Sequence, residues 1–451
     1  MPKLYETKTS DSFPYLALSY CWGGKQGIVT LEDTYLGYTQ KLPVESLSKS
    51  IRDAINITGD LGFRYLWIDA LCIIQDKNED KMSQINLMGL IYRNAAATIA
   101  AANSGSAKDG FLRDWPMYEP CALPLLLPSG ELGTIFVEKV QKLGSFTDDV
   151  PFAPLDLRGW TLQESLLSSR ILHFGSHDLT WHCQTDILGG LFSTHTSFMS
   201  CSETKHARKN ATSAVPDFPE RLPPSVFQGL QIENKSELGH LTKVWVAIVG
   251  EYSKRGLTNE ADRLPALAGL ASEFQKSTGY GFVSGMWRHG LIRQLGWRSS
   301  YGSQSQYQAD STSLTPSWSW TTKSLGVDFD LIETEDAEIL SCITKELPGQ
   351  SSLTEIHECK LMILGKMIQA SRVKRRTGIV FTMDYKGMAK GELDGNTLWL
   401  LLGYKNRGKS VGLVIQSLPN GNFVRLGQLT VPKSNKVWEH KDLKLQEITF
   451  V

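Results

Sequence analysis

The sequence predicts an α/β fold for the N-terminal part of the chain, followed by a helical region and a C-terminal antiparallel β module. The first observation is a nearly continuous apolar run at residues 65–76, which is typical of a strand in a parallel sheet covered by helices. The second is the alternation of strand-like and helix-like segments around that run. The third is a series of short strand-like segments, separated by turns, beyond about residue 325.

The elements of the N-terminal sheet are expected in the following order. Residues 15–24 begin apolar and end in a glycine pair, which predicts a core strand that opens into a loop. Residues 44–61 place their apolar side chains on one helical face. A second helix is expected at residues 79–95 and a third strand at residues 97–102. Together with the run at 65–76, these segments give the strand–helix alternation of a parallel sheet.

The pattern becomes irregular between residues 103 and 157, where six prolines predict an insertion over the sheet. A helix is expected to start near residue 157, and strands are expected at residues 170–174 and 179–183. The sequence therefore predicts a first domain at residues 1–190 that carries an insertion at about 103–157.

The remainder of the chain divides into two expected parts. Residues 191–325 form a Ser-, Thr- and Pro-rich linker followed by helices at about 241–252 and 262–274. Trp318 and Trp320 stand at alternate positions, which predicts that they pack on one face of a strand. Residues 326–451 form the β module, with strands expected at 339–343, 361–368, 378–385, 397–404, 412–416, 422–429 and 446–451.

Composition narrows the classes of function and location. Lys+Arg and Asp+Glu are both 47, so bulk charge gives no support for binding nucleic acid or an anionic membrane. The seven cysteines are an odd number without a Cys-x-x-Cys motif, which favours free thiols in a reducing compartment. No secretory signal is expected, because no N-terminal stretch has a charged start followed by an apolar core, and no apolar run reaches about 18 residues. We therefore expect a cytoplasmic protein without a membrane span or a nucleic-acid partner.

Asp69 is the one acid within the apolar run at residues 65–76. An ionised carboxylate is costly to bury without a partner, so Asp69 is expected where the strand leaves the core, next to a partner or a ligand. The carboxyl ends of strands are the ligand-binding edge of open α/β sheets. Alternatively, Asp69 has a structural role, in which it caps a turn or pairs with an arginine. Structural ion pairs perturb the pKa values of acids as readily as active sites do, so an acid at this place does not by itself indicate a functional site.

Four motifs occur in a fixed order, at residues 15–23 (YLALSYCWG), 67–75 (WIDALCIIQ), 88–95 (MGLIYRNA) and 158–164 (RGWTLQE). Together they closely resemble the HET (heterokaryon incompatibility) domain of filamentous fungi. Five later segments also resemble the region C-terminal to this domain in many such proteins: residues 252–255, 257–258, 262–269, 316–320 and 412–415.

The resemblance implies a cell-death trigger used in non-self recognition and defence, with a domain distantly related to TIR domains. It therefore implies a TIR- or flavodoxin-like parallel sheet with helices on both faces. The chain has no Walker A motif and no repeats, so sensing would fall to its own β module or to an incompatibility partner protein. A homo-oligomer is also implied, because TIR-like sites are often completed across a subunit contact.

The TIR relationship suggests a chemical role for one residue. NAD-cleaving TIR-type enzymes carry a catalytic Glu, in many of them within Trp-x-x-x-Glu, and Trp160 and Glu164 have that spacing here. Nicotinamide leaves NAD as a neutral molecule, so a single carboxylate that stabilises an oxocarbenium-like ribose is sufficient. Glu164 is then the catalytic residue, with NAD as a substrate and no cofactor or metal. Alternatively, Glu164 is a helix-start acid that pairs with Arg158 or is favoured by the helix dipole.

The same relationship suggests residues that line the pocket. Asp69 and the loop with Ser19, Trp22, Gly23 and Gly24 are expected to surround the substrate at the strand ends, where Trp22 or Trp160 can stack on a ring. Arg158 can meet a phosphate, although an ion pair is the alternative. The glycine pair is weak as a phosphate loop because it is not part of a Gly-x-Gly-x-x-Gly motif. Trp160 is otherwise a core residue.

Two other constellations need consideration. Cys21 or Cys72 can act as a nucleophile with His173 or His182, although a buried thiol more often behaves as a small hydrophobe. His173, His177, His182 and Cys183 can be combined into a zinc site, although their spacing matches no standard one.

These residues leave three functional hypotheses. The first is an NAD glycohydrolase-like effector, the second is a non-catalytic signalling or assembly module that acts through protein partners, and the third is another small-molecule reaction in the same pocket.

Overall fold

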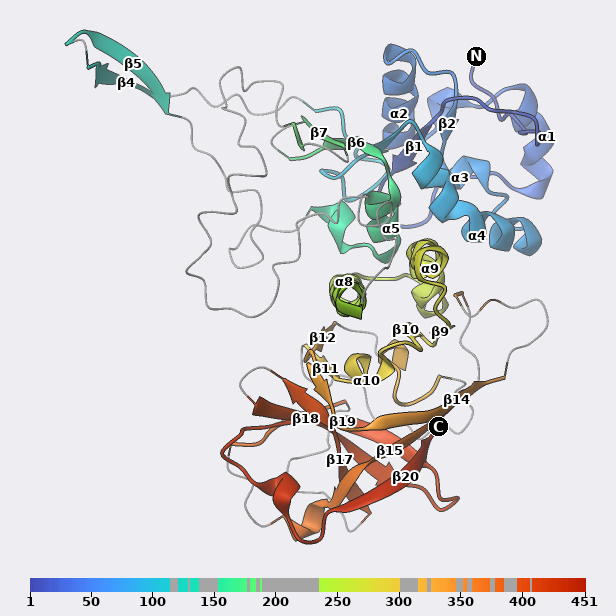
Figure 1. The fold of residues 1–451 in the computed structure, drawn as a ribbon. Helices are drawn as coiled ribbons and strands as arrows, with labels where there is room; N and C mark the ends of the chain where they lie inside the picture. The colour runs from blue at the N-terminus through green and yellow to red at the C-terminus, as the bar shows by residue number, and fades with distance from the viewer. Residues whose placement is uncertain are drawn as a thin grey trace. The chain divides into compact units, whose positions relative to one another are not determined.

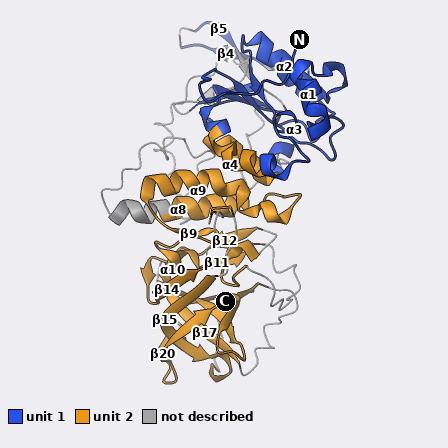
Figure 2. Cartoon of the chain, turned by 90° about the vertical axis from the view of Figure 1, so that its right-hand side faces the viewer, with its two compact units in different colours: residues 1–81, 91–157, 168–214 blue, residues 82–90, 158–167, 215–451 orange. Residues whose placement is uncertain are grey.

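The computed structural model describes residues 1–113, 121–128, 130–137, 153–176, 179–183, 187–188, 235–300, 315–322, 326–345, 351, 353–354, 359–373, 378–384, 396–405 and 408–451 (Figure 1). The chain divides into two compact units, coloured in Figure 2. Unit 1 comprises residues 1–81, 91–157 and 168–214, and unit 2 comprises residues 82–90, 158–167 and 215–451. The three expected domains are continuous in sequence whereas these units are not, so the boundaries at 190 and 325 stay predictions.

Unit 1 contains a mixed sheet with its helices. Its elements are β1 (Leu16–Ser19), α1 (Glu32–Gln40), α2 (Lys49–Asp60), β2 (Leu66–Trp67), α3 (Asp69–Cys72), the ends of α4 (Asn78–Asn94), β3 (Ala97–Ala100), β4 (Cys121–Leu126), β5 (Leu132–Val137), β6 (Arg170–Phe174), β7 (Leu179–Cys183) and β8 (Ile187–Leu188). The strands expected at 170–174 and 179–183 are confirmed at those bounds, and the expected helix at 79–95 is confirmed as α4.

The strand order in this sheet is β2-β1-β3-β6-β7-β8. The pairings of β1 with β2, β1 with β3 and β3 with β6 are parallel, whereas β7 and β8 add antiparallel strands. All four residues of β1 and all four of β3 are buried, which is the pattern of central strands. Leu47, Ile51 and Ala54 belong to the same core as these strands, so α2 packs on the sheet. The predicted α/β class is confirmed, and the sheet is mixed, with parallel strands at β2, β1, β3 and β6.

The apolar run at residues 65–76 differs from the strand that we expected. Only Leu66–Trp67 forms a strand, and both residues are half-buried. The chain then turns into the short helix α3, in which the N–H of Cys72 donates to the carbonyl of Ile68 at 2.7 Å. Periodicity cannot distinguish a short buried strand from a buried helical turn, because both read as an unbroken apolar run.

The insertion at 103–157 contains an antiparallel hairpin that the sequence pattern did not predict. Its strands β4 and β5 pair from Cys121 opposite Val137 to Leu126 opposite Leu132. Pro124 lies within β4, and proline is tolerated in a two-stranded ribbon because one side of each strand needs no ladder hydrogen bond. The prolines therefore did not exclude regular strands from this segment, although the sequence pattern predicted an irregular insertion.

Unit 2 begins with a group of helices. They are the middle of α4 at residues 82–90, α5 (Gly159–Leu167), α8 (Lys235–Tyr252) and α9 (Pro265–Thr278). α5 packs against α9. The backbones of α9 and α4 approach so closely that a Cβ at Gly269 would lie 2.8 Å from the Cα of Gly89. α8 is 18 residues long, yet none of the described helices is long and apolar enough to cross a membrane.

A tryptophan-rich core joins these helices to the following strands. Trp245, Trp297, Trp318 and Trp320 are each at most 1% exposed and belong to one apolar cluster. The expectation that Trp318 and Trp320 lie on one face of a strand is wrong. Residues 317–319 form a turn and Trp320 begins a 3-10 helix, so both indoles reach the same core from a folded segment.

The C-terminal part of unit 2 is the expected β module. Its main strands are β13 (Thr334–Glu335), β14 (Glu338–Thr344), β15 (Cys359–Gln369), β16 (Val380–Met383), β17 (Thr397–Lys405), β18 (Lys409–Ser417), β19 (Phe423–Val431) and β20 (Lys444–Phe450). All seven expected strands are confirmed. The ladder runs β17-β18-β19-β20-β15 and returns to β17, so five strands close on themselves while β14 stays at one end (Figure 1). Most pairings are antiparallel, and β19 with β20 is parallel.

Candidate functional site

The candidate site in unit 1 lies at the carboxyl ends of β1, β2 and β3. Because β2 and β3 lie on opposite sides of β1, the strand order reverses at β1, and such reversal points are where open α/β sheets bind ligands. The loops that follow β1 and β3 meet at this edge, since a Cβ at Gly23 would lie 2.4 Å from the Cβ of Ser106.

Gly23 and Gly24 shape the first of these loops. Their φ angles are +68° and +119°, in a region that L side chains rarely adopt. Both residues are exposed. A Cβ at Gly24 would meet no atom within 4 Å, so the loop is open on that side. The glycine pair therefore lets the backbone turn sharply and pass close to the loop after β3.

Asp69 lies directly after β2, as the first residue of α3. Its Oδ2 accepts a hydrogen bond of 2.8 Å from Nε1 of Trp22, and its Oδ1 accepts one of 2.6 Å from the backbone N–H of Ala70. Both Trp22 and Asp69 are half-buried. The carboxylate thus caps the turn after β2, as one interpretation expected, and it also holds the loop after β1.

The backbone of the same loop is fixed at two further points. The carbonyl of Trp22 accepts hydrogen bonds from Nε2 of Gln26 at 2.8 Å and from the N–H of Ala107 at 3.4 Å. The carbonyl of Ser19 accepts the N–H of Ala101 at 2.9 Å. Ser19 is 4% exposed at the end of β1, so its side chain lies within the fold rather than on an open surface.

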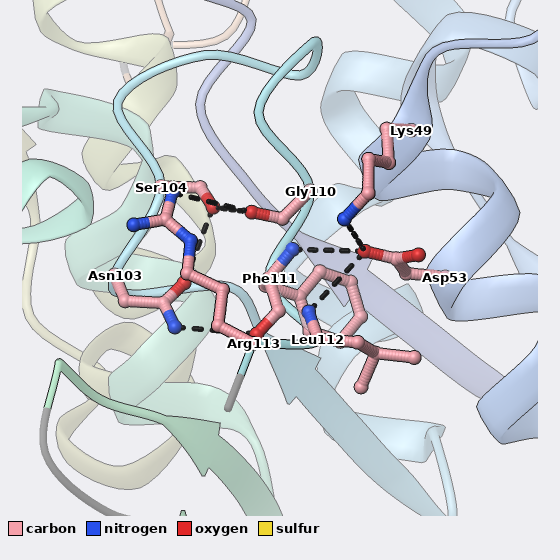
Figure 3. A network of polar contacts seen from close by, with 8 residues as sticks. All are labelled: Lys49, Asp53, Asn103, Ser104, Gly110, Phe111, Leu112 and Arg113. Atoms are coloured by element: carbon pink, nitrogen blue, oxygen red, sulfur yellow. Dashed lines mark hydrogen bonds and ion pairs between the residues drawn. The ribbon is translucent and has the colours of Figure 1, made fainter. Parts of the chain in front are cut away.

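A buried acid on α2 holds the loop after β3 (Figure 3). Oδ2 of Asp53 accepts the backbone N–H groups of Phe111 at 2.9 Å and Leu112 at 3.2 Å, and Nζ of Lys49 lies 3.5 Å away. Nδ2 of Asn103 donates to the carbonyl of Phe111 at 3.2 Å within the same network. These contacts fix the segment that approaches Gly23.

Sequence reasoning missed Asp53 and Asn103. Asp53 is 8% exposed and lies between Ile51 and Ala54 on the buried face of α2. An acid among apolar positions on one helical face was a visible signal, because such a carboxylate must find donors. Asn103 comes soon after the third strand, near the edge where polar residues face a ligand.

The Trp-x-x-x-Glu residues lie on α5 in unit 2. Glu164 is 6% exposed, on the helix that packs against α9. The preceding Gln163 anchors this packing, because its Oε1 accepts the N–H of Gly269 at 3.1 Å. Glu164 is therefore set among packed helices, where a carboxylate needs polar partners.

Trp160 and Arg158 flank the start of α5. Nε1 of Trp160 donates to Oδ2 of Asp262 at 3.2 Å, and its ring packs against the tryptophan-rich core. Trp160 therefore has the core role that the alternative interpretation gave it. The backbone of Arg158 bridges to Gly256, and the carbonyl of Arg158 accepts a hydrogen bond from Oγ1 of Thr161 at 2.8 Å. Arg158 is half-buried.

The structure brings together the predicted residues of unit 1, namely Ser19, Trp22, Gly23, Gly24 and Asp69. It brings together Arg158, Trp160 and Glu164 separately, in unit 2. The convergence of Asp69 and Glu164 on one crevice stays a prediction, because the two acids belong to different units.

The cysteine nucleophile hypothesis is not supported. Cys72 keeps a little exposed surface, but burial of its thiol raises its pKa to about 11. The backbone hydrogen bond from Ile68 acts to lower this pKa, and the charge of Asp69 acts to raise it. A thiol with this pKa is protonated at neutral pH and is a poor nucleophile. Cys21 is 4% exposed.

The zinc hypothesis concerned His173, His177, His182 and Cys183. His177 lies outside the described residues, and the rings of His173 and His182 are 5.4 Å apart. In the part of the chain that the structure describes, no group of three or more His, Cys, Asp or Glu side chains is arranged to hold a metal ion.

Comparison with known proteins bears on the first unit and α5. Residues 15–164 match the family model of the heterokaryon incompatibility protein (HET), which covers about a third of the chain and ends at Glu164. No curated protein and no solved structure matches the chain.

Proposed function

We propose, from the premise that residues 15–164 form a HET domain, that this protein is a cell-death effector of heterokaryon incompatibility and that the domain cleaves NAD. The proposal includes a cytoplasmic location, assembly into a homo-oligomer and an incompatibility partner protein as the trigger. The fold that we propose for the domain is TIR-like. The order of the four parallel strands, β2-β1-β3-β6, supports this, because it is the order of the first four strands in flavodoxin-like sheets.

The observation that carries the proposal is the hydrogen bond from Trp22 to Asp69 beside Gly23 and Gly24. It places a carboxylate, an indole and exposed backbone at the edge where the strand order reverses. We propose that these residues, with Ser19, form the wall of the nicotinamide–ribose site. Arg158 and Trp160, near the start of α5 in unit 2, are the further residues that we propose for NAD binding.

The proposed chemistry needs one well-placed carboxylate. The nicotinamide–ribose bond breaks with its electron pair moving to the pyridinium nitrogen, so the leaving group departs neutral and needs no general acid. The positive charge that develops on the ribose is stabilised by an adjacent carboxylate, and water adds to the ribose and releases one proton to the solvent. We assign the stabilising carboxylate to Glu164.

The second candidate function is a signalling or assembly module without catalysis. The observation that favours it is the 6% exposure of Glu164 on a helix packed against α9, since this is also how a structural acid is placed. In that case the death signal passes through contacts with protein partners.

The experiment is chromatography of NAD after incubation with the purified full-length protein. Glu164→Gln keeps the shape of the side chain and removes its charge, so nicotinamide release should fall to background. Glu273→Gln is the matched control, because Glu273 is also 6% exposed on a helix of unit 2. It should retain activity.

Thermal unfolding of both variants separates the two candidate functions. A much larger fall in Tm for Glu164→Gln than for Glu273→Gln shows that Glu164 is structural. A wild-type protein that releases no nicotinamide at any concentration rules out NAD cleavage. Toxicity that persists in a folded Glu164→Gln protein shows that partner contacts, not catalysis, deliver the signal.

A further inference from the structure

Two thiols of the C-terminal module lie within reach of each other. Sγ of Cys342 and Sγ of Cys359 are 3.5 Å apart, on the neighbouring strands β14 and β15. In the antiparallel register Cys342 is opposite Leu361 and Thr344 is opposite Cys359, so the two cysteines are diagonal neighbours on one face. The proposed function assigns no role to either residue.

We propose that Cys342 and Cys359 form an oxidation site for hydroperoxides, in which Cys342 reacts first and Cys359 resolves the product into a disulfide. The thiolate of Cys342 attacks one oxygen of hydrogen peroxide, the O–O bond breaks, and Cys342 becomes a sulfenic acid while one water is released. The thiol of Cys359 then displaces the sulfenic oxygen as a second water. Two thiols and one peroxide thus give one disulfide and two waters.

The surroundings distinguish the roles of the two thiols. Cys342 is half-buried on β14, so a small oxidant can reach it, whereas Cys359 is 3% exposed. The hydrogen bond from Cys359 lowers the pKa of Cys342, and the charge of Arg288 lowers it further, against the effect of burial. The same hydrogen bond and burial raise the pKa of Cys359. The thiolate is therefore favoured at the accessible sulfur, as in other oxidation-sensitive cysteines.

Arg288 is a positioning residue for this pair. It follows β10 (Met286–Trp287), and its guanidinium donates to the backbone carbonyl of Cys342 and, at 2.8 Å, to Oγ1 of Thr344. These two contacts hold the strand segment that carries Cys342. They also keep a positive charge beside its sulfur.

The position of β14 allows the two sulfurs to close the remaining gap. A disulfide has an S–S length of about 2.05 Å, so the sulfurs must approach by about 1.5 Å. β14 lies at the end of the sheet order and is paired with β15, and its register shifts between Ile339 and Ser341. An end strand with a register irregularity can move without breaking a ladder on its other side.

The test uses the reduced full-length protein, treated with an equimolar amount of hydrogen peroxide and then with a thiol-alkylating reagent. Peptide mapping should show the Cys342 and Cys359 peptides joined, with the loss of two hydrogens and reversal by dithiothreitol. Cys21, which is 4% exposed, is the control thiol and should stay reduced. Unlinked Cys342 and Cys359 peptides after complete consumption of the peroxide would overturn the proposal.

Variants test the order of the two steps. In Cys359→Ser, dimedone should trap a sulfenic acid at Cys342, and in Cys342→Ser it should trap none at Cys359. Cys359→Ala gives the same readout if serine is not tolerated at this buried position. Arg288→Gln should slow sulfenic acid formation severalfold, and Arg288→Lys should restore part of the rate. Equal dimedone labelling at both cysteines would refute the assignment of roles.

Discussion

Nε1 of Trp22 donates a 2.8 Å hydrogen bond to Oδ2 of Asp69, and this contact joins the chain after β1 to the turn after β2. The two residues are 47 positions apart in sequence. Both belong to the segment that matches the HET family, and both lie at the edge where the strand order of the sheet reverses. The contact fixes the geometry of the proposed nicotinamide–ribose wall.

Trp22→Phe should weaken this wall while leaving most of the apolar packing in place. The variant removes the indole N–H, so Oδ2 of Asp69 loses a donor, and a hydrogen bond to a charged group contributes about 1.5–3 kcal/mol. We expect the free energy of unfolding to decrease by an amount in this range. Nicotinamide release should decrease as well. Trp438→Phe is the control for the loss of an indole N–H, since Trp438 donates at 2.8 Å to Ser410 in the C-terminal module. Trp22→Phe with unchanged stability would show that the contact is not significant.

Gly23→Ala should destabilise unit 1 more than Gly24→Ala does. Both positions have positive φ angles, so both variants strain the backbone by about 1–3 kcal/mol. At Gly23 the new Cβ would also lie 2.4 Å from the Cβ of Ser106, whereas at Gly24 it would meet nothing within 4 Å. Urea unfolding of the two variants measures the difference. Equal stability losses would mean that the loops after β1 and β3 are not in close contact.

Asp53→Ala should loosen the segment that follows β3. The variant leaves the N–H groups of Phe111 and Leu112 without their acceptor, and each lost partner costs about 1–3 kcal/mol. Amide hydrogen exchange should therefore increase at these two residues in particular. Lys49→Ala is the control, because Nζ of Lys49 is 3.5 Å from the carboxylate and 43% of its side chain is exposed. Because Lys49 itself is solvated, its contact with the carboxylate should contribute no more than about 1 kcal/mol.

The sequence predicted regular elements well where a pattern belonged to a single element. β6 and β7 have the expected bounds, since their limits follow from local alternation and flanking turn residues. The apolar run at 65–76 was misinterpreted, because burial makes a strand and a helical turn equally apolar.

Contacts between distant residues explain the remaining failures at the site. Asp53 was missed because its partners are backbone groups 58 and 59 positions away, which leave no mark in the local sequence. Asp69 was selected as the one acid of an apolar run and Trp22 through the family resemblance, but neither pattern predicted the hydrogen bond between them. The environment of Glu164 likewise depends on the packing of α5 against α9, which no motif describes.

Gly269→Ala should destabilise unit 2 although alanine favours helices. A Cβ at Gly269 would lie 2.8 Å from the Cα of Gly89 and 2.8 Å from Oε1 of Gln163, so α9 must move away from its neighbours. Overpacking of this kind costs about 1–3 kcal/mol, which exceeds the helical gain of about 1 kcal/mol. Gly37→Ala in α1 is the control, because its Cβ would meet nothing within 4 Å, and it should stabilise the protein. Stabilisation by both variants would contradict the close approach at Gly269.

Asp330 should make the stability of unit 2 depend on pH in the acidic range. It follows β12 (Val327–Phe329), and it accepts hydrogen bonds from Lys405 at 2.7 Å and from Gln428 at 2.8 Å. Burial acts to raise the pKa of Asp330, but the hydrogen bonds and the charges of Lys405 and Arg298 outweigh it, so the pKa lies below its ordinary value.

The sign of the pH effect is set by this lowered pKa. The folded protein favours the ionised carboxylate, so the stabilisation is fully present above the unfolded pKa of about 4 and is lost as the pH falls through the folded pKa. Asp330→Asn should therefore cost most near pH 7 and progressively less towards pH 3, as measured by urea unfolding at several pH values. Asp328→Asn is the control, since Asp328 lies 3.8 Å from Arg298 in a half-exposed pair and should have a small effect throughout. If the difference between wild type and Asp330→Asn is constant from pH 7 to pH 3, then Asp330 is held by its shape and hydrogen bonds rather than by its charge.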